Sequence, residues 1–273
     1  MLSNSDDIGK NTRGSDICSG SRSLYNKGLF FVTIGVKKDD KGRISAIKIN
    51  GNDYEFLGVV LEEDFHLSFP FIFEYQNELF MCPDTHEKGE IRVYKCTEFP
   101  NKWEFHKTLM EGVSAADSII FKRDNIWWLF TNIDKSVVGD YGCQLHIFRA
   151  DNPLSDEWVA HENNPVIFDP LLARNGGLIV NQNEIYRIYQ RQGFDIYGES
   201  CGIARITSLS PTEYIEETHS VVKPHFFKGE FQVVDEAPYV VGPDDMDWDI
   251  VTHNTVDEIL GGNGRVMETY TTG

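Results

Sequence analysis

Several features that would point to a familiar class of function are missing from this sequence of 273 residues. The longest mostly apolar run, Leu29–Val36, is far shorter than the roughly 18–20 residues of a membrane-spanning helix, so no such span is expected. Basic residues are also scarce, because 25 Lys and Arg stand against 43 Asp and Glu, for a formal charge of −18. A surface this acidic repels phosphate backbones, and we therefore expect no nucleic-acid partner.

Cysteine is sparse, and its pattern excludes a zinc knuckle. The cysteines are odd in number, and no pair has the short spacing of such a site. They are Cys18, Cys82, Cys96, Cys143 and Cys201. The N-terminal segment 1–7 has neither a basic nor an apolar stretch, so no leader peptide is expected. We predict free thiols and a reducing, cytoplasmic location.

Motifs for several common kinds of chemistry are absent as well. The sequence has no Gly-rich loop that would cradle phosphates and no Gly-x-Ser-x-Gly elbow. Asp245, Asp247 and Asp249 match the first ligands of a calcium loop, but Ile250 replaces the loop glycine and Val256 the closing glutamate. We therefore predict an acidic surface loop there, no metal site and no cofactor. A loosely held divalent cation is the alternative that this segment leaves open.

What the sequence does contain is a repeat. Three segments, 70–84, 118–132 and 176–191, each have an apolar run, a polar turn ending in asparagine and a second run rich in aromatics. This pattern predicts three β-hairpins. Each hairpin is followed by two strand-like runs, and three such runs precede the first hairpin. The following runs are 91–96 and 103–109, 145–150 and 158–161, and 202–207 and 214–222; the preceding runs are 28–36, 44–49 and 54–61.

Four-stranded units that recur at intervals of about 50 residues predict an all-β fold, a five-bladed β-propeller. The first and last blades are expected to be degenerate or incomplete, the last one opening at 226–234. A solenoid or a sandwich is the competing architecture. We assign residues 24–273 to this single domain. The segment 1–23, rich in Ser, Gly, Asn and Asp, is predicted to be a disordered arm.

Propeller geometry selects candidate site residues. The first strand of a blade lines the central channel and the second strand returns to the face where the first began, so both ends share one rim. This rim contains the segments 66–69, 115–117, 173–175 and 195–199 and the return residues Asp84, Asn132 and Arg191. The expected substrate-binding residues are Ser68, Arg174, Asn175, Arg191 and Tyr197.

Asp117 is the strongest candidate for a catalytic residue. It lies at the predicted channel mouth, where a carboxylate gains nothing from the core. It can orient a sugar hydroxyl, bind a cation or act in acid–base chemistry; the alternative is an aspartate that binds backbone N–H groups at a strand start. Asp84 can complete the pair of carboxylates that glycosyl chemistry needs, or it is a turn residue after Pro83.

Other charged candidates also have two interpretations. His66 can bind a hydroxyl or act as a base, which makes it the third catalytic candidate, or it is a rim histidine with only structural hydrogen bonds. Arg174 and Arg191 can form an anion-binding patch in an otherwise acidic molecule, or they form ion pairs between blades.

These segments resemble a known family, the N-terminal domain of plant glucosamine inositolphosphorylceramide transferase and its stand-alone bacterial relatives. The matching blocks are His66–Asp84, Arg92–Tyr94, Trp103, Ala115–Ser118, Trp128–Phe130, Leu145–Phe148 and Tyr197–Gly198. The resemblance covers residues 28–222 and implies a five-bladed propeller similar to those of furanosidase-type glycoside hydrolases. The residues that match family positions are His66, Ser68, Asp117, Arg174 and Tyr197.

The sequence also departs from this family. Asp84 stands where the family usually has glutamate, and Asp16–Arg22 does not match the Asp-Pro-Phe-like strand that supplies another channel carboxylate. The closing His-Thr segment is matched only loosely by Thr252–Thr255. The first blade is therefore either completed by the C-terminal segment 265–270 or incomplete.

Two hypotheses of function follow, together with a plainer one. The first is a carbohydrate-active enzyme of surface-polysaccharide assembly, a glycosyltransferase or a glycoside hydrolase-like protein whose ligand is a sugar, a glycan or a nucleotide sugar. The second is a non-catalytic, glycan-binding propeller that acts with a partner glycosyltransferase, because the resemblance implies that transfer belongs to a separate domain. A propeller that binds only proteins is the third. We expect the first.

Overall fold

The computed structural model describes residues 29–36, 41–50, 53–136, 139–181, 184–193, 199–222 and 266–268. Every regular element among them is a strand apart from one 3-10 turn, η1 (His86–Lys88). The part of the chain that is described contains no helix of the length and apolarity that a membrane crossing requires. The predicted arm at 1–23 and the predicted strand at 226–234 lie outside the described residues.

The strands form four antiparallel sheets. The first contains β1 (Leu29–Val36), β2 (Lys41–Asn50) and β3 (Asp53–Leu61). The second contains β4 (Ser68–Tyr75), β5 (Glu78–Asp84), β6 (Glu90–Glu98) and β7 (Lys102–Glu111). The third contains β8 (Ala115–Arg123), β9 (Ile126–Ile133), β10 (Gln144–Ala150) and the short β11 (Val159–Ala160) and β12 (Ile167–Phe168). The fourth contains β13 (Arg174–Asn181), β14 (Glu184–Arg191), β15 (Ser200–Leu209), β16 (Tyr214–Val222) and β17 (Val266–Glu268).

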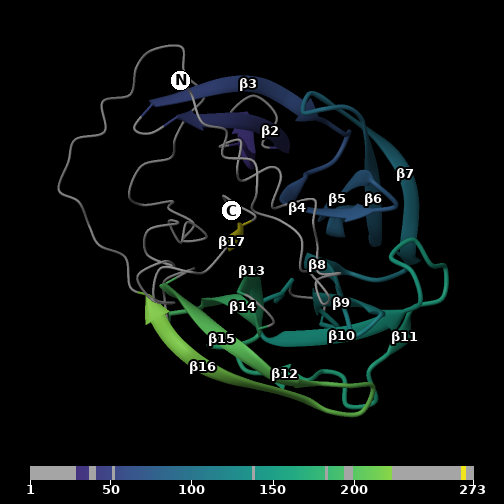
Figure 1. Ribbon diagram of the computed structural model, residues 1–273, viewed down its shortest axis with the longest axis vertical. Helices are drawn as coiled ribbons and strands as arrows, with labels where there is room; N and C mark the ends of the chain where they lie inside the picture. The colour runs from purple at the N-terminus through teal and green to yellow at the C-terminus, as the bar shows by residue number, and fades with distance from the viewer. Residues whose placement is uncertain are drawn as a thin grey trace, which may run out of the picture.

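The sheets are arranged radially, as Figure 1 shows. β4, β8, β13 and the short β17 lie toward the centre, and β3, β7 and β16 lie at the periphery. β8 contacts both β4 and β13, so the innermost strands of neighbouring sheets meet. The all-β class is confirmed, and the arrangement is propeller-like.

The predicted hairpins form, and their turns explain why. The residues that connect β4 to β5 and β8 to β9 all have positive φ: Gln76 (53°), Asn77 (62°), Asp124 (53°) and Asn125 (64°). Two consecutive residues with positive φ make a type I′ turn, which Asn and Asp tolerate and which matches the twist of a hairpin. The turn between β13 and β14 lies outside the described residues.

The core lies between the sheets, which explains the near-continuous apolar runs. In β8 every residue from Ala115 to Phe121 is buried, because an inner strand contacts neighbours on both faces. Aromatic rings connect adjacent sheets: the Phe73 and Trp127 ring centroids are 6.1 Å apart, in an edge-on arrangement.

Two parts of the fold differ from the sequence prediction. The outer strand expected at 158–161 is only two residues long, and β12 joins the same edge of β10. Between them the Asn164 side chain replaces a strand, because its amide accepts from Ile147 N at 2.8 Å and donates to Ile147 O at 2.7 Å. The C-terminal β17 pairs with β13 of the fourth sheet, rather than completing the first sheet.

Candidate functional site

β4, β8 and β13 each have a β-bulge near their first residues. The pairing shifts register between Ser68 and Phe71 in β4, between Ala116 and Ile119 in β8, and between Asn175 and Gly177 in β13. At equivalent places Phe69 has a φ of 46° and Asp117 a φ of 53°. Positive φ is costly for residues with a side chain, so the bulge holds both residues in a strained conformation.

The pairing shows which residues of the three hairpins are equivalent. Ser68 faces Asp84, Ala116 faces Asn132, and Arg174 faces Gln190. The residue of the third hairpin that is equivalent to Asp84 and Asn132 is therefore Gln190, one residue before Arg191. Because successive strand residues point to opposite faces, this shift reverses the direction of the side chain. A role of Arg191 in substrate binding stays a prediction.

Asp117 and Arg174 form an ion pair between two sheets. Arg174 Nε donates to Asp117 Oδ2 at 2.9 Å, and the side chains are 17% and 2% exposed. Of the two interpretations left open for Arg174, the structure shows the ion pair between blades. A guanidinium so close stabilises the charge of a carboxylate that is removed from water.

A network of buried hydrogen bonds holds the starts of β8 and β13 together. Asn175 Nδ2 donates to the backbone oxygen of Asp117 at 2.9 Å, and Asn175 N donates to Asn132 Oδ1 at 2.8 Å. Asn132 Nδ2 in turn donates to Ala173 O at 2.8 Å. Buried amides with paired donors and acceptors fix the bulge that presents Asp117.

Asp84 is paired with a histidine that the sequence analysis did not select. Asp84 Oδ1 accepts from the backbone N of His86 at 2.9 Å and lies 2.9 Å from His86 Nδ1. The first contact is the local aspartate turn that was the structural alternative for Asp84. The second orients the imidazole, so that Nε2 is its remaining nitrogen. The signal was an aspartate two residues before a histidine.

The surroundings of His86 favour its protonated form. The pKa of the imidazole is raised by the hydrogen bond with Asp84, opposed by partial burial, and raised further by the charges of Asp84, Glu87 and Asp117. Both carboxylates that the sequence paired therefore favour the charged imidazole, Asp84 through a direct hydrogen bond and Asp117 through its charge. Its ring also lies against Tyr141, with 5.1 Å between centroids.

His66 and Ser68 lie at the same rim. His66 Nδ1 accepts from Gly42 N at 3.0 Å, so this nitrogen is held by the backbone of the first sheet. His66 N donates to Glu87 Oε2 at 3.0 Å, beside η1. Ser68 Oγ donates to Asp84 Oδ2 at 3.4 Å. A role of either side chain in substrate binding or catalysis stays a prediction.

The remaining predicted residues are Arg191, Tyr197 and those of the acidic segment. Arg191 Nη1 donates to Leu171 O at 3.5 Å, and this is a contact with the protein backbone. Tyr197 and the Asp245, Asp247 and Asp249 segment lie outside the described residues. Among those that are described, no group of three or more His, Cys, Asp or Glu side chains can hold a metal ion.

A buried arginine beneath the rim was also missed. Arg187 is 0% exposed; its Nη2 donates to Leu172 O at 2.6 Å and to Glu216 Oε1 at 2.5 Å. Arg187 Nη1 reaches Asn175 Oδ1 at 3.5 Å, so the arginine supports the segment that leads into β13. The available signal was an arginine between two apolar pairs of residues, Ile185–Tyr186 and Ile188–Tyr189.

Comparison with known proteins identifies the family. Residues 24–231 match the family described as Glucosamine inositolphosphorylceramide transferase 1, N-terminal. The transferases of this name from Oryza sativa subsp. japonica and Arabidopsis thaliana are 34% and 33% identical to the chain over 202 residues, 71% of its length. The chain belongs to this family. It covers only 27% and 26% of those two relatives.

The match to the glucosamine inositolphosphorylceramide transferase 1 N-terminal family includes all the rim residues described above. Among solved structures, a family 117 glycoside hydrolase from Zobellia galactanivorans aligns with a TM-score of 0.48 and 12% identity, over 69% of this chain and 58% of that one. An exo-1,5-alpha-L-arabinanase from a bovine ruminal metagenomic library aligns with a TM-score of 0.47 and 10% identity, over 67% and 71%. TM-scores below 0.5 do not establish a shared fold.

Proposed function

We propose that this chain is a five-bladed propeller of glycan assembly that binds a sugar at the rim and transfers or cleaves a glycosyl group there. Membership of the transferase family supports a carbohydrate-related role. The observation that carries the proposal is the Asp117 carboxylate, which is buried in a strained bulge and whose charge acts on the His86 of the Asp84–His86 pair.

The bulge alone does not require a carboxylate. Phe69 occupies the equivalent bulge of β4 with nearly the same φ, and it is a buried core residue. An apolar side chain therefore satisfies the fold at this position, whereas Asp117 places a charge there that needs Arg174 as a partner. A group that costs free energy to bury, where the fold does not demand it, indicates a function.

In this proposal His86 is the acid and Asp117 the carboxylate that faces the sugar. The protonated His86 gives its Nε2 proton to the leaving oxygen as the bond from that oxygen to the sugar carbon breaks. Asp117 stabilises the positive charge that develops on the sugar ring. Asp117 then takes the proton of the incoming hydroxyl, from water in cleavage or from an acceptor sugar in transfer.

Substrate access to Asp117 requires Arg174 to move. The Asp117 side chain is 2% exposed and that of Arg174 17% exposed, so the guanidinium is the more accessible partner. In this proposal it turns from Asp117 to an anionic group of the substrate, such as a phosphate.

Product analysis tests this function. The protein is incubated with glycans alone and with nucleotide sugars plus glycan acceptors, and products are identified by mass spectrometry. We expect turnover by the wild type, its loss in Asp117→Asn, and a decrease of about 100-fold or more in His86→Gln. Asp124→Asn is the matched control, because Asp124 has the same φ of 53° on an exposed turn. Unchanged turnover in Asp117→Asn would refute the proposal.

The burial of Asp117 favours a second candidate, a non-catalytic glycan-binding propeller. A carboxylate engaged by Arg174 and removed from solvent is also what a structural ion pair requires. In this candidate the transfer itself is performed by a partner glycosyltransferase. Sugar binding without any product, retained in Asp117→Asn, would favour this candidate.

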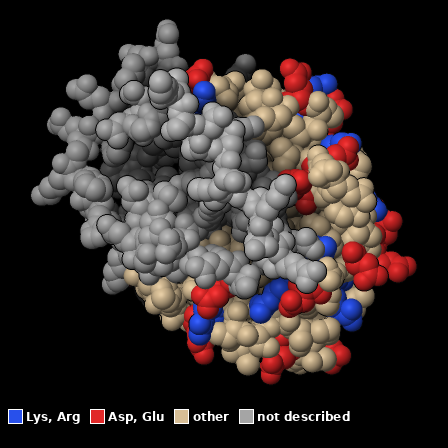
Figure 2. Space-filling model, viewed as in Figure 1, with Lys and Arg blue, Asp and Glu red and all other residues tan. Residues whose placement is uncertain are grey.

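The cellular location is part of the same proposal. Among the described residues, Cys82, Cys96, Cys143 and Cys201 form no disulfide, as the sequence predicted. Free thiols support a reducing compartment, and we propose the cytoplasm. On the face shown in Figure 2, Lys and Arg side chains of the described residues lie scattered among Asp and Glu. This pattern supports a sugar, rather than a nucleic acid, as the partner.

A further inference from the structure

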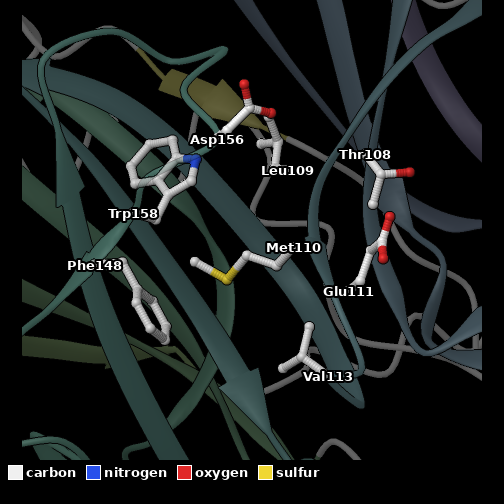
Figure 3. A pocket seen from close by; sticks show the side chains of 8 residues that line it. All are labelled: Thr108, Leu109, Met110, Glu111, Val113, Phe148, Asp156 and Trp158. Carbon is white, nitrogen blue, oxygen red and sulfur yellow. The ribbon is translucent and has the colours of Figure 1, made fainter.

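A short connection, residues 112–114, leads from β7 of the second sheet to β8 of the third. Gly112 has a φ of 67°, which turns the chain there. Figure 3 shows Val113 with Met110 and Glu111 in the lining of a pocket of about 480 Å³. A segment that borders a void has fewer packing contacts, so its hydrogen bonds have to hold it in place.

The first of these hydrogen bonds lead to the backbone of His86. Val113 N donates to Gly89 O at 3.0 Å, and Gly89 N donates to His86 O at 2.8 Å. Gly89 ends η1 in the left-handed conformation, with a φ of 64°, which glycine adopts without strain. The backbone of His86 is therefore tied to the connection at 112–114.

The same connection binds both ends of the loop from β9 to β10. At the start of the loop, Asp134 N donates to Ser114 O at 3.1 Å. Toward its end, the Tyr141 hydroxyl lies 2.6 Å from Ser114 Oγ. The Asp134 carboxylate also accepts from Ser136 N at 2.7 Å and from Gly139 N at 2.8 Å, which shapes the loop from within. Tyr141 is therefore held by its hydroxyl and by the loop that carries it.

Tyr141 returns from this loop to the side chain of His86. The two ring centroids are 5.1 Å apart and the ring planes are inclined by 56°. The hydrogen bond between His86 Nδ1 and Asp84 alone lets the imidazole turn about that contact, because the last torsion of a histidine side chain is only weakly restricted. A second ring, fixed beside the first, removes this freedom.

We propose that Tyr141 is a positioning residue, which fixes the imidazole of His86 so that Nε2 keeps the direction that proton transfer needs. This inference rests on the proposed role of His86 as the acid. Proton transfer depends steeply on the geometry of donor and acceptor, and the His86 side chain is 30% exposed, so the surrounding core does not fix it by itself. Tyr141 and the backbone contacts of His86 converge on one segment, so the ring and its support keep a constant relation.

Kinetics of the substrate found by product analysis give the first test. Tyr141→Leu should lower kcat by about 10-fold or more and change KM by less than about two-fold, because a misdirected acid slows the chemical step without weakening binding. Tyr141→Phe keeps the ring and should stay within about three-fold of the wild type. In the His86→Gln background, Tyr141→Leu should cause no further loss, because no acid remains to be positioned. Tyr75→Leu is the matched control, since Tyr75 has a similar ring contact with Trp127, at 5.7 Å, at the opposite end of β4.

NMR of the His86 ring protons gives a second test that needs no turnover. The signals are assigned with His86→Gln, and they should move in Tyr141→Leu but much less in Tyr141→Phe or Tyr75→Leu, because a neighbouring aromatic ring shifts them. These shifts in a protein without any turnover would contradict the proposed function alone. The inference is overturned if the His86 signals are unchanged in Tyr141→Leu, if Tyr141→Phe is as slow as Tyr141→Leu, or if Tyr141→Leu lowers turnover equally with and without His86.

Discussion

Asp117 on β8 and Arg174 on β13 are joined by a 2.9 Å hydrogen-bonded ion pair that crosses from one sheet to the next. The bulges of β8 and β13 are equivalent. Arg174 occupies the position of Ala116 in β8, and Asp117 occupies the position of Asn175 in β13, one residue further along the strand. The pair therefore joins two inner strands at their bulges.

The first prediction concerns the energy of this pair. Asp117→Asn should lower the free energy of unfolding by about 2 kcal/mol, because it leaves a largely buried guanidinium without its charge partner. Adding Arg174→Met to Asp117→Asn should lower the free energy of unfolding only a little more. Chemical denaturation of the wild type, the two single variants and the double variant measures the coupling energy of the pair. Asparagine also tolerates the positive φ of this position, so backbone strain does not confound the result. Strictly additive effects would contradict the account.

The second prediction concerns the protonation of His86. Its pKa, followed by NMR titration, should lie above the ordinary value of about 6.5 and should fall in Asp84→Asn, which removes the charge that raises it. A raised pKa in the folded state contributes stability below pH 6.5, and this contribution is lost as the pH rises through the folded pKa. The stability difference between wild type and Asp84→Asn should shrink over that range. A His86 pKa that does not respond to Asp84→Asn would contradict the pairing.

The third prediction concerns a buried histidine in β10. His146 is 2% exposed, neither ring nitrogen has a hydrogen-bond partner among the described residues, and burial together with the charge of Lys135 lowers its pKa to about 4. Between pH 6.5 and 4 the imidazole is therefore protonated in the unfolded chain but neutral in the folded chain. Stability should therefore fall by about 3 kcal/mol as the pH drops from 6.5 to 4.

Leucine at position 146 removes the cost of burying an imidazole that has no hydrogen-bond partner. His146→Leu should be more stable than the wild type at pH 5, and by a smaller margin at pH 8, as measured by denaturant titration at both values. His106→Gln is the control, because His106 is exposed on β7. An unchanged pH dependence in His146→Leu would show that this imidazole is solvated.

The fourth prediction concerns the arginine beneath the rim. Arg187→Met should destabilise the protein by about 3–5 kcal/mol, because it leaves Glu216 buried without a cation. Adding Glu216→Gln should recover part of the loss. Arg205→Met, which removes exposed ion pairs with Glu184 and Glu217, should cost less than about 1 kcal/mol. Equal losses in the two arginine variants would contradict the structural role of Arg187.

The secondary structure could be predicted well because it depends on local patterns. The turn residues Asn77 and Asn125 and the apolar runs beside them specify their hairpins without reference to the rest of the chain. The replacement of a strand by the Asn164 amide could not be foreseen, because it depends on where Ile147 lies in the third sheet. The pairing of β17 with β13 is likewise a long-range choice between two sheet edges.

The rim could be predicted in outline but not in its contacts. Asp117, Asp84 and Arg174 were selected because they flank inner strands, and the structure brings them to one region. His86 was missed because its importance comes from a side-chain contact with Asp84 and from the nearby charge of Asp117, neither of which follows from strand periodicity. Gln190, rather than Arg191, is the residue equivalent to Asp84 and Asn132, because each of the three follows its turn asparagine by the same number of residues.

Thermal unfolding with sugar ligands tests most directly whether Asp117 serves a carbohydrate site. The purified protein is heated with nucleotide sugars and with neutral oligosaccharides. A ligand at 100 times its dissociation constant adds about 2.7 kcal/mol, which corresponds to an increase in Tm of roughly 5–10 °C. We predict this increase for at least one ligand, its loss on adding Asp117→Asn and its retention on adding Asp124→Asn. An equal increase with Asp117→Asn, or no increase with any ligand, would contradict the account.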